Sequence, residues 1–174
     1  MYAPRIIRRR FHWPTAFMVT GVFAALVGSA IFGLHTIMNQ SPLPPAIRQQ
    51  ITFPVFIPTS GISLDQLSYK FVADQKVLSF TGRLTDGQHI TFTEQPTPPP
   101  FNDIPNYTTQ FLQTLFEYQA FDSLQGTVHL THPKGAGQAA VMNAKGTLMF
   151  ARVDNDEPQS AWQSLFNSMV IYTR

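Results

Sequence analysis

The chain contains no cysteine, so no disulfide can hold it together, and thiol catalysis and cysteine metal sites are excluded. Charged side chains are also scarce, because Asp, Glu, Lys and Arg make up only 13% of the residues. This scarcity is greatest in residues 15–38, where no charged side chain occurs. A domain without disulfides needs a core of its own, and the 15 phenylalanines provide apolar side chains for one.

The uncharged stretch 15–38 predicts a transmembrane helix about 36 Å long, enough for a hydrocarbon core of about 30 Å. Trp13 lies at its start, where an amphipathic ring suits the membrane interface. Four arginines precede the stretch, namely Arg5, Arg8, Arg9 and Arg10. The next basic residue after it is Arg48. The positive-inside rule therefore predicts a basic cytoplasmic tail at 1–14, and it places the rest of the chain on the extracytoplasmic side of the cell membrane.

Two other interpretations of the N-terminus exist. Gly28-Ser29-Ala30 resembles a signal-peptide cleavage site, but apolar residues continue beyond it to Met38. Arg8-Arg9-Arg10-Phe11 resembles a twin-arginine export signal, but His12 follows where an apolar residue is expected. We therefore favour an uncleaved signal anchor, and the sequence leaves cleavage open.

One face of the predicted helix carries small residues at every fourth position, namely Gly21, Ala25, Ser29 and Gly33. Such a stripe lets a second membrane helix approach closely. Small residues are common in membrane helices, which is the simpler explanation. The candidate partners are therefore the lipid bilayer and, as an alternative, another membrane helix or envelope protein.

The net charge of +2 comes from the N-terminal tail. Without its four arginines, the remaining basic residues are outnumbered by the 10 acidic ones, so the rest of the chain is weakly acidic. A phosphate-binding face needs clustered cations, so we expect no nucleic-acid partner.

After the helix, the sequence predicts a proline-rich linker at 39–50, in which Pro42, Pro44 and Pro45 prevent a helix, and one extracytoplasmic domain at 51–174. Alternating apolar residues predict strands around Leu67–Phe71, 78–84 and 90–94, with a turn at Asp86-Gly87 joining the last two into a hairpin. Further strands are predicted at 126–130, 138–143 and 147–153, the last two as a hairpin. The apolar segment 51–58 carries two prolines, which confine it to a sheet edge.

Two helices are predicted in this domain. The first spans about 107–120, with Asn106 as N-cap and an apolar face formed by Phe111, Leu112, Leu115 and Phe116. The second follows the acidic residues Asp154, Asp156 and Glu157 and begins near Pro158. Its predicted buried face consists of Ala161, Trp162, Leu165, Phe166 and Met169. The order of elements predicts an α+β fold in which two helices pack on an antiparallel sheet.

No catalytic motif, cofactor motif or metal-binding motif is recognisable. His129 and His132 are the closest histidine pair, but strand residues three apart point to opposite faces and make a poor metal site. The stretch 154–157 lacks the glycine and the later glutamate of a calcium loop, so we expect its acids to cap the following helix. We therefore predict no catalytic, cofactor or metal residues.

Some segments resemble known proteins. The opening Phe53-Pro54-Val55-Phe56-Ile57-Pro58 with Gly61 and Leu64, the strand ending at 92–96, the strand 146–150 and the helix ending at 167–169 are similar to a family of uncharacterised bacterial envelope domains. These domains stand outside a single membrane helix in anti-sigma-factor-like proteins, and their fold is related to the lipoprotein-carrier half-barrel. The resemblance covers residues 51–171. It implies a fold and an envelope location but no activity, because the 14-residue tail is too short for a sigma-binding domain.

These features predict a non-enzymatic, membrane-tethered extracytoplasmic binding or assembly module of the cell envelope. The alternatives are a half-barrel carrier of lipids or other hydrophobic ligands and, third, an envelope hydrolase whose residues converge only in the fold. The identity of the ligand or partner and the oligomeric state are open at this level.

Overall fold

The computed structural model describes residues 42–135 and 137–173, which belong to the compact unit Ser41–Arg174. Among them, no helix combines the length and the apolar character that a membrane crossing requires. The predicted transmembrane helix 15–38 lies outside the described residues. The same holds for the residues assigned to topology and helix contact, namely Arg5, Arg8, Arg9, Arg10, Trp13, Gly21, Ala25, Ser29 and Gly33.

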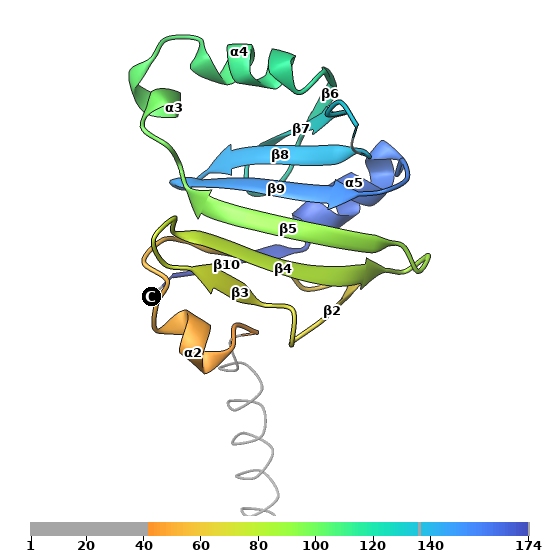
Figure 1. Ribbon diagram of the computed structural model, residues 1–174. Helices are drawn as coiled ribbons and strands as arrows, with labels where there is room; N and C mark the ends of the chain where they lie inside the picture. The colour runs from red at the N-terminus through yellow and green to blue at the C-terminus, as the bar shows by residue number, and fades with distance from the viewer. Residues whose placement is uncertain (1–41, 136, 174) are drawn as a thin grey trace, which may run out of the picture. The chain divides into compact units, whose positions relative to one another are not determined.

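The fold is α+β with antiparallel sheets, in agreement with the sequence. The strands are β1 (Val55–Pro58), β2 (Ile62–Leu64), β3 (Lys70–Val72), β4 (Val77–Leu84), β5 (His89–Pro96), β6 (Glu117–Asp122), β7 (Thr127–Thr131), β8 (Ala139–Ala144), β9 (Thr147–Val153) and β10 (Met169–Tyr172). The helices of the described part are α2 (Pro45–Arg48), α3 (Pro100–Asp103), α4 (Tyr107–Thr114) and α5 (Gln159–Asn167). The large sheet has the order β2-β4-β5-β9-β8-β7-β6 with β3 also paired to β4, and β1 and β10 form a second sheet (Figure 1).

The hairpin of β4 and β5 forms where alternation and Asp86-Gly87 predict it. Phe80 lies opposite Phe92 in the register, and both side chains are fully buried. Gly87 has a φ of +91°, a conformation that glycine adopts without steric cost, so the turn can close tightly. The predicted hairpin of β8 and β9 is likewise present.

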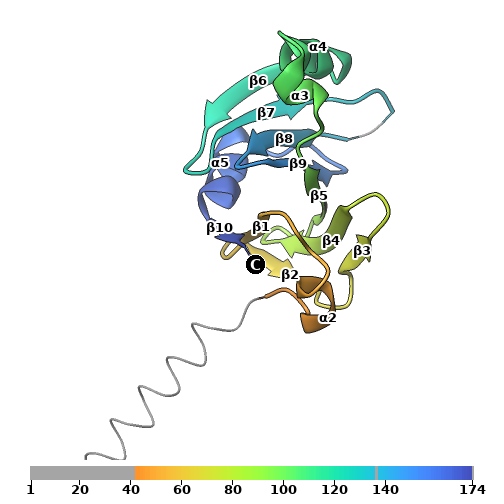
Figure 2. The same cartoon turned by 90° about the vertical axis from the view of Figure 1, so that its left-hand side faces the viewer.

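The core lies on one side of the large sheet, which we call the inner face. Every second residue of the central strands points there, and the set includes Leu78, Phe80, Ile90, Phe92, Met149 and Ala151. These side chains pack against Phe56 of β1 and against Trp162 and Phe166 of α5. The two longer helices pack on different faces of the large sheet. Helix α5 covers the inner face, and α4 lies on the opposite side (Figure 2).

The first predicted helix is shorter than expected, and the strand that follows it was not predicted. Helix α4 ends at Thr114, and Phe116 takes a φ of +56°, which reverses the chain into β6. The side chain of Phe116 is 57% exposed instead of lying on the apolar helix face. Asn106 does occupy the N-cap position, but its side chain makes no capping hydrogen bond.

Three smaller predictions also differ from the structure. The linker prediction excluded a helix, yet Pro45 opens α2, because proline is tolerated in the first helical turn, where its missing amide costs nothing. Leu43 in the same segment is buried in the core. The strand predicted from Leu67 begins only at Lys70, and Leu67 is 94% exposed in the preceding turn. Met169 is buried as expected but belongs to β10 and not to the last helix.

Candidate functional site

The side of the large sheet opposite the core, which we call the outer face, carries the candidate site. Strand β5 presents His89, Thr91 and Thr93 there, at alternate positions. Thr91 lies opposite Arg152 of β9, and Thr93 lies opposite Phe150. Because β9 pairs with β8 and β8 with β7, the row through Arg152 continues to Ala139 and Thr131. Four strands thus bring residues from distant parts of the chain onto one surface.

These residues line a pocket of about 510 Å³, which we call the outer-face pocket. Its lining consists of His89, Thr91, Thr93, Leu115, Thr131, Pro133, Ala139, Phe150, Arg152 and Asp154. The sheet forms the floor, and the end of α4 and the β7–β8 connection form walls. The volume falls in the range of about 300–1,000 Å³ that is usual for small-molecule sites.

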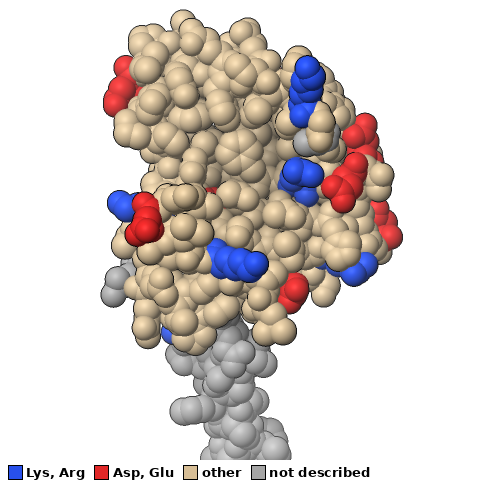
Figure 3. Space-filling model, viewed as in Figure 1, with Lys and Arg blue, Asp and Glu red and all other residues tan. Residues whose placement is uncertain are grey.

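Charge is sparse on this face and gathers mostly toward its edges (Figure 3). Arg152 is the one cationic Lys or Arg side chain among the residues that line the outer-face pocket, and its guanidinium lies 3.8 Å from the carboxylate of Asp154. Both side chains are more than half exposed, so water screens the pair and its free energy is small, at most about 1 kcal/mol. The contact with Asp154 therefore holds Arg152 only weakly.

A second apolar cluster covers the neighbouring part of the outer face. Leu112 of α4 is buried against Val141 of β8 and Leu148 of β9. Around these three residues pack Phe101, Phe111, Leu115 and Phe150. Leu112 is the one buried residue of the eight in α4. The α3–α4 segment therefore rests on the sheet through a few side chains next to the outer-face pocket.

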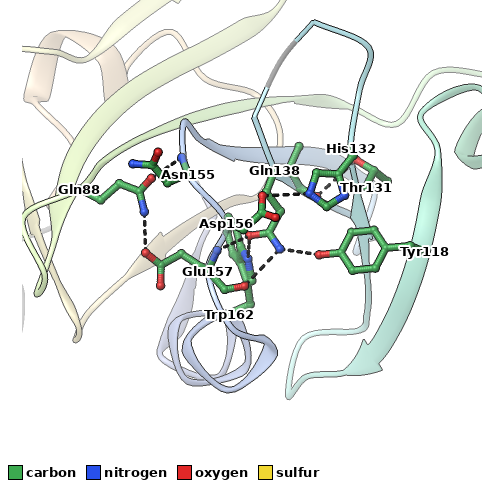
Figure 4. A network of polar contacts seen from close by, with 10 residues as sticks. Gln88, Tyr118, Thr131, His132, Gln138, Asn155, Asp156, Glu157 and Trp162 are labelled. Atoms are coloured by element: carbon green, nitrogen blue, oxygen red, sulfur yellow. Dashed lines mark hydrogen bonds and ion pairs between the residues drawn. The ribbon is translucent and has the colours of Figure 1, made fainter.

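Gln138 has a buried side-chain amide immediately before β8, at the centre of a network of hydrogen bonds (Figure 4). Its Oε1 accepts hydrogen bonds from the indole Nε1 of Trp162 at 2.6 Å and from the backbone amide of Glu157 at 2.8 Å. Its Nε2 donates to the carbonyl oxygen of Glu157 at 3.1 Å and to the hydroxyl of Tyr118. These contacts tie β8, β6 and the start of α5 together, and they position Ala139, the next residue, in the pocket floor.

Another buried polar group lies on the inner face, where Glu94 of β5 is fully inaccessible to solvent. Burial raises the pKa of its carboxyl well above the ordinary value of 4.5, and the hydrogen bond from the Phe56 amide, at 3.0 Å, opposes the rise. The other carboxyl oxygen and the nearby hydroxyl of Tyr69 find no hydrogen-bond partner among the described residues. Burial, with the neighbouring Glu94 second, raises the pKa of Tyr69 as well.

His129 and His132, the closest histidine pair in the sequence, bond to different carboxylates in the fold. Nδ1 of His129 lies 2.5 Å from the carboxylate of Glu117, whereas Nε2 of His132 lies 2.9 Å from that of Asp156. In the part of the chain that the structure describes, no group of three potential metal ligands converges. The expected capping by residues 154–157 is wrong in detail, because Pro158 is the N-cap of α5 and no side chain caps it. Instead, the carboxylate of Glu157 accepts a hydrogen bond from the Gln88 side chain at 2.6 Å.

The sequence predicts no residue of the outer-face pocket as a binding residue. Its threonines alternate with core residues, and such positions are usually assigned to solvent. The types of residue at these positions are the one local indication of a binding surface. An ordinary exposed face carries lysines and glutamates, whereas the outward residues of β5 and β9 include Thr93 and Phe150. Finding the pocket also required the pairing of β5 with β9, which no local pattern reveals.

Comparison with known proteins adds no further information about this site. The chain matches no protein-family model, and it is significantly similar neither to a curated protein nor to a solved structure.

Proposed function

We propose that this chain is a membrane-tethered, extracytoplasmic binding module of the cell envelope that catalyses no reaction and holds its ligand in the outer-face pocket. The observation that carries the proposal is the pocket itself, which has the size of a small-molecule site and combines apolar walls with a few polar groups. The tether and its orientation rest on the uncharged stretch 15–38 and the arginines before it.

The two alternative functions receive less support. A half-barrel carrier would hold its ligand on the inner face, but there Phe80, Phe92 and Trp162 are fully buried and packed in one core. A hydrolase of the serine type needs a histidine bonded to a hydroxyl nucleophile. Of the three histidines that the structure describes, His129 and His132 bond to carboxylates, and no hydroxyl among the described residues is hydrogen-bonded to the side chain of His89.

The absence of cysteine permits a local binding assay. A single Lys134→Cys change places a thiol beside Pro133 at the pocket wall, where it can carry an environment-sensitive fluorophore. The labelled full chain, in nanodiscs of phosphatidylcholine, is titrated with 2-naphthol, a small and mainly apolar probe. We expect saturable binding that Thr93→Trp abolishes, because the larger side chain fills the pocket floor.

Thr81→Trp is the matched control. Thr81 lies on β4 opposite Thr91 but does not line the pocket, so this variant should bind 2-naphthol like the parent. Equal binding by both tryptophan variants, or no saturable signal in the parent, would count against the proposal.

The predicted orientation has a separate test. A reporter enzyme that is active only outside the cytoplasm is fused either after residue 174 or before residue 1. We expect activity from the C-terminal fusion alone, and activity from the N-terminal fusion alone would reverse the predicted topology.

A further inference from the structure

Along β9, the outward side chains change from charged to apolar. Starting beyond the end of the strand and moving backward, Asp154, Arg152, Phe150 and Leu148 follow one another at alternate positions. On β9 itself the polarity gradient covers three side chains of one face, Arg152, Phe150 and Leu148. A ligand lying along it meets the ion pair of Arg152 and Asp154 at one end and the ring of Phe150 toward the other.

The charged end of this gradient is open. Arg152 and Asp154 both line the outer-face pocket, and both are mainly exposed. Thr91, the strand neighbour of Arg152, adds a hydroxyl beside the guanidinium. An anionic group at this position would combine a charge-assisted hydrogen bond from Arg152 with neutral ones from hydroxyl groups.

The apolar end continues beneath α4. Phe150 meets Phe111 edge to face, with ring centroids 6.1 Å apart, and Leu148 is buried against Leu112. Leu112 and Leu148 are almost inaccessible to solvent, and the second hollow that they help to line, of about 210 Å³, also has polar lining residues, namely Thr108, Thr127, His129 and Asn143. The apolar surface open to a ligand is therefore the part of the outer-face pocket around Phe150 and Leu115, next to α4.

We infer that the ligand of the outer-face pocket is a single-chain anionic amphiphile, whose acidic group contacts Arg152 and whose hydrocarbon chain runs along β9 past Phe150 toward α4. This inference rests on the binding function proposed above and adds the chemistry of the ligand. A purely apolar ligand would leave Arg152 unused, and a small anion would leave the apolar end of the gradient unfilled.

The test compares three probes on the labelled full chain in phosphatidylcholine nanodiscs at fixed lipid concentration. Decanoate has both the charge and the chain, decanol has the chain alone, and acetate has the charge alone. We expect decanoate to bind about tenfold more tightly than decanol, and acetate to give no saturable signal.

Substitutions of Arg152 distinguish the effect of its charge on ligand binding from the effect of its side-chain packing. Arg152→Gln should weaken decanoate about tenfold and leave decanol unchanged, whereas Arg152→Lys should keep the preference for decanoate. Arg83→Gln removes an exposed arginine of β4 that does not line the pocket, and it should change neither affinity. Equal binding of decanoate and decanol by the parent, or an unchanged preference in Arg152→Gln, would overturn the inference.

The apolar end has its own variant. Phe150→Ser should weaken decanoate and decanol by the same factor, since both lose contact with the hydrocarbon surface. If neither 2-naphthol nor any of the three probes binds saturably, the binding function itself is refuted. Binding of 2-naphthol together with equal affinities for decanoate and decanol leaves that function standing and refutes the anionic amphiphile alone. Saturable binding of a short peptide carboxylate in place of decanoate likewise refutes the amphiphile.

Discussion

Replacing Gln138 by leucine should destabilise the domain by about 2–5 kcal/mol. The side chain is 2% exposed, and leucine fills a similar volume without any hydrogen-bonding group. The change leaves two donors without a partner, the indole N–H of Trp162 and the backbone amide of Glu157. An unsatisfied buried donor costs about 1–3 kcal/mol. Trp162 is 1% exposed and cannot turn to water, whereas Glu157 is only half-buried and recovers part of its loss.

The measurement is urea denaturation of the full chain in detergent, followed by circular dichroism of the strands. Gln119→Leu is the control, because Gln119 bonds Gln159 at the exposed edge of β6 and should cost less than about 0.5 kcal/mol. Trp162→Phe removes the orphaned indole donor, so in the Gln138→Leu background it should cost less than it does alone. A loss below 0.5 kcal/mol for Gln138→Leu, or strict additivity in the double variant, would refute this account of the network.

Three further predictions concern the core and one close backbone approach. Because the pKa of Glu94 is raised in the fold, the folded state keeps its proton above pH 4.5 while the unfolded chain loses it. The unfolding free energy should therefore fall as pH rises above 4.5, by up to about 1.4 kcal/mol per pH unit, and Glu94→Gln should remove this slope in denaturation curves collected from pH 4 to 8. Tyr69→Phe deletes a buried hydroxyl without a partner among the described residues, so its urea midpoint should stay equal or rise, and a clear fall would reveal a missed contact. Gly137→Ala places a Cβ 2.1 Å from the carbonyl oxygen of Val153, so thermal denaturation should show a loss of about 1–3 kcal/mol, and an unchanged melting temperature would contradict the packing described at this glycine.

The sequence predicts those elements whose local pattern and tertiary role agree. In the β4–β5 hairpin, Leu78 and Phe80 alternate with polar residues, and Asp86-Gly87 supplies the turn. Helix α5 repeats its apolar residues at helical spacing, and Trp162, Leu165 and Phe166 are buried as that spacing predicts.

Where local pattern and tertiary structure disagree, the prediction fails. Residues 117–122 have no strong strand alternation and follow an amphipathic pattern, so the sequence predicts a helix that continues to about residue 120. The positive φ of Phe116 and the pairing with β7 determine the strand, and neither is visible in the local sequence. The outer-face pocket is not predictable from the sequence for a related reason. Its floor depends on the register between β5 and β9, whose residues lie far apart in the chain.

The pairing of β1 with β10 determines when the first strand gains its partner during folding. Val55 lies opposite Tyr172, so the first strand of the domain obtains its partner only from the last one. All side chains of β1 are buried, which leaves an apolar strand without a neighbour until residues 169–172 are present. Contacts between such distant residues form late and slow the folding of a chain. A chain still being synthesised would therefore keep β1 without its strand partner until residues 169–172 are made, and this strand is where a chaperone would have most to protect.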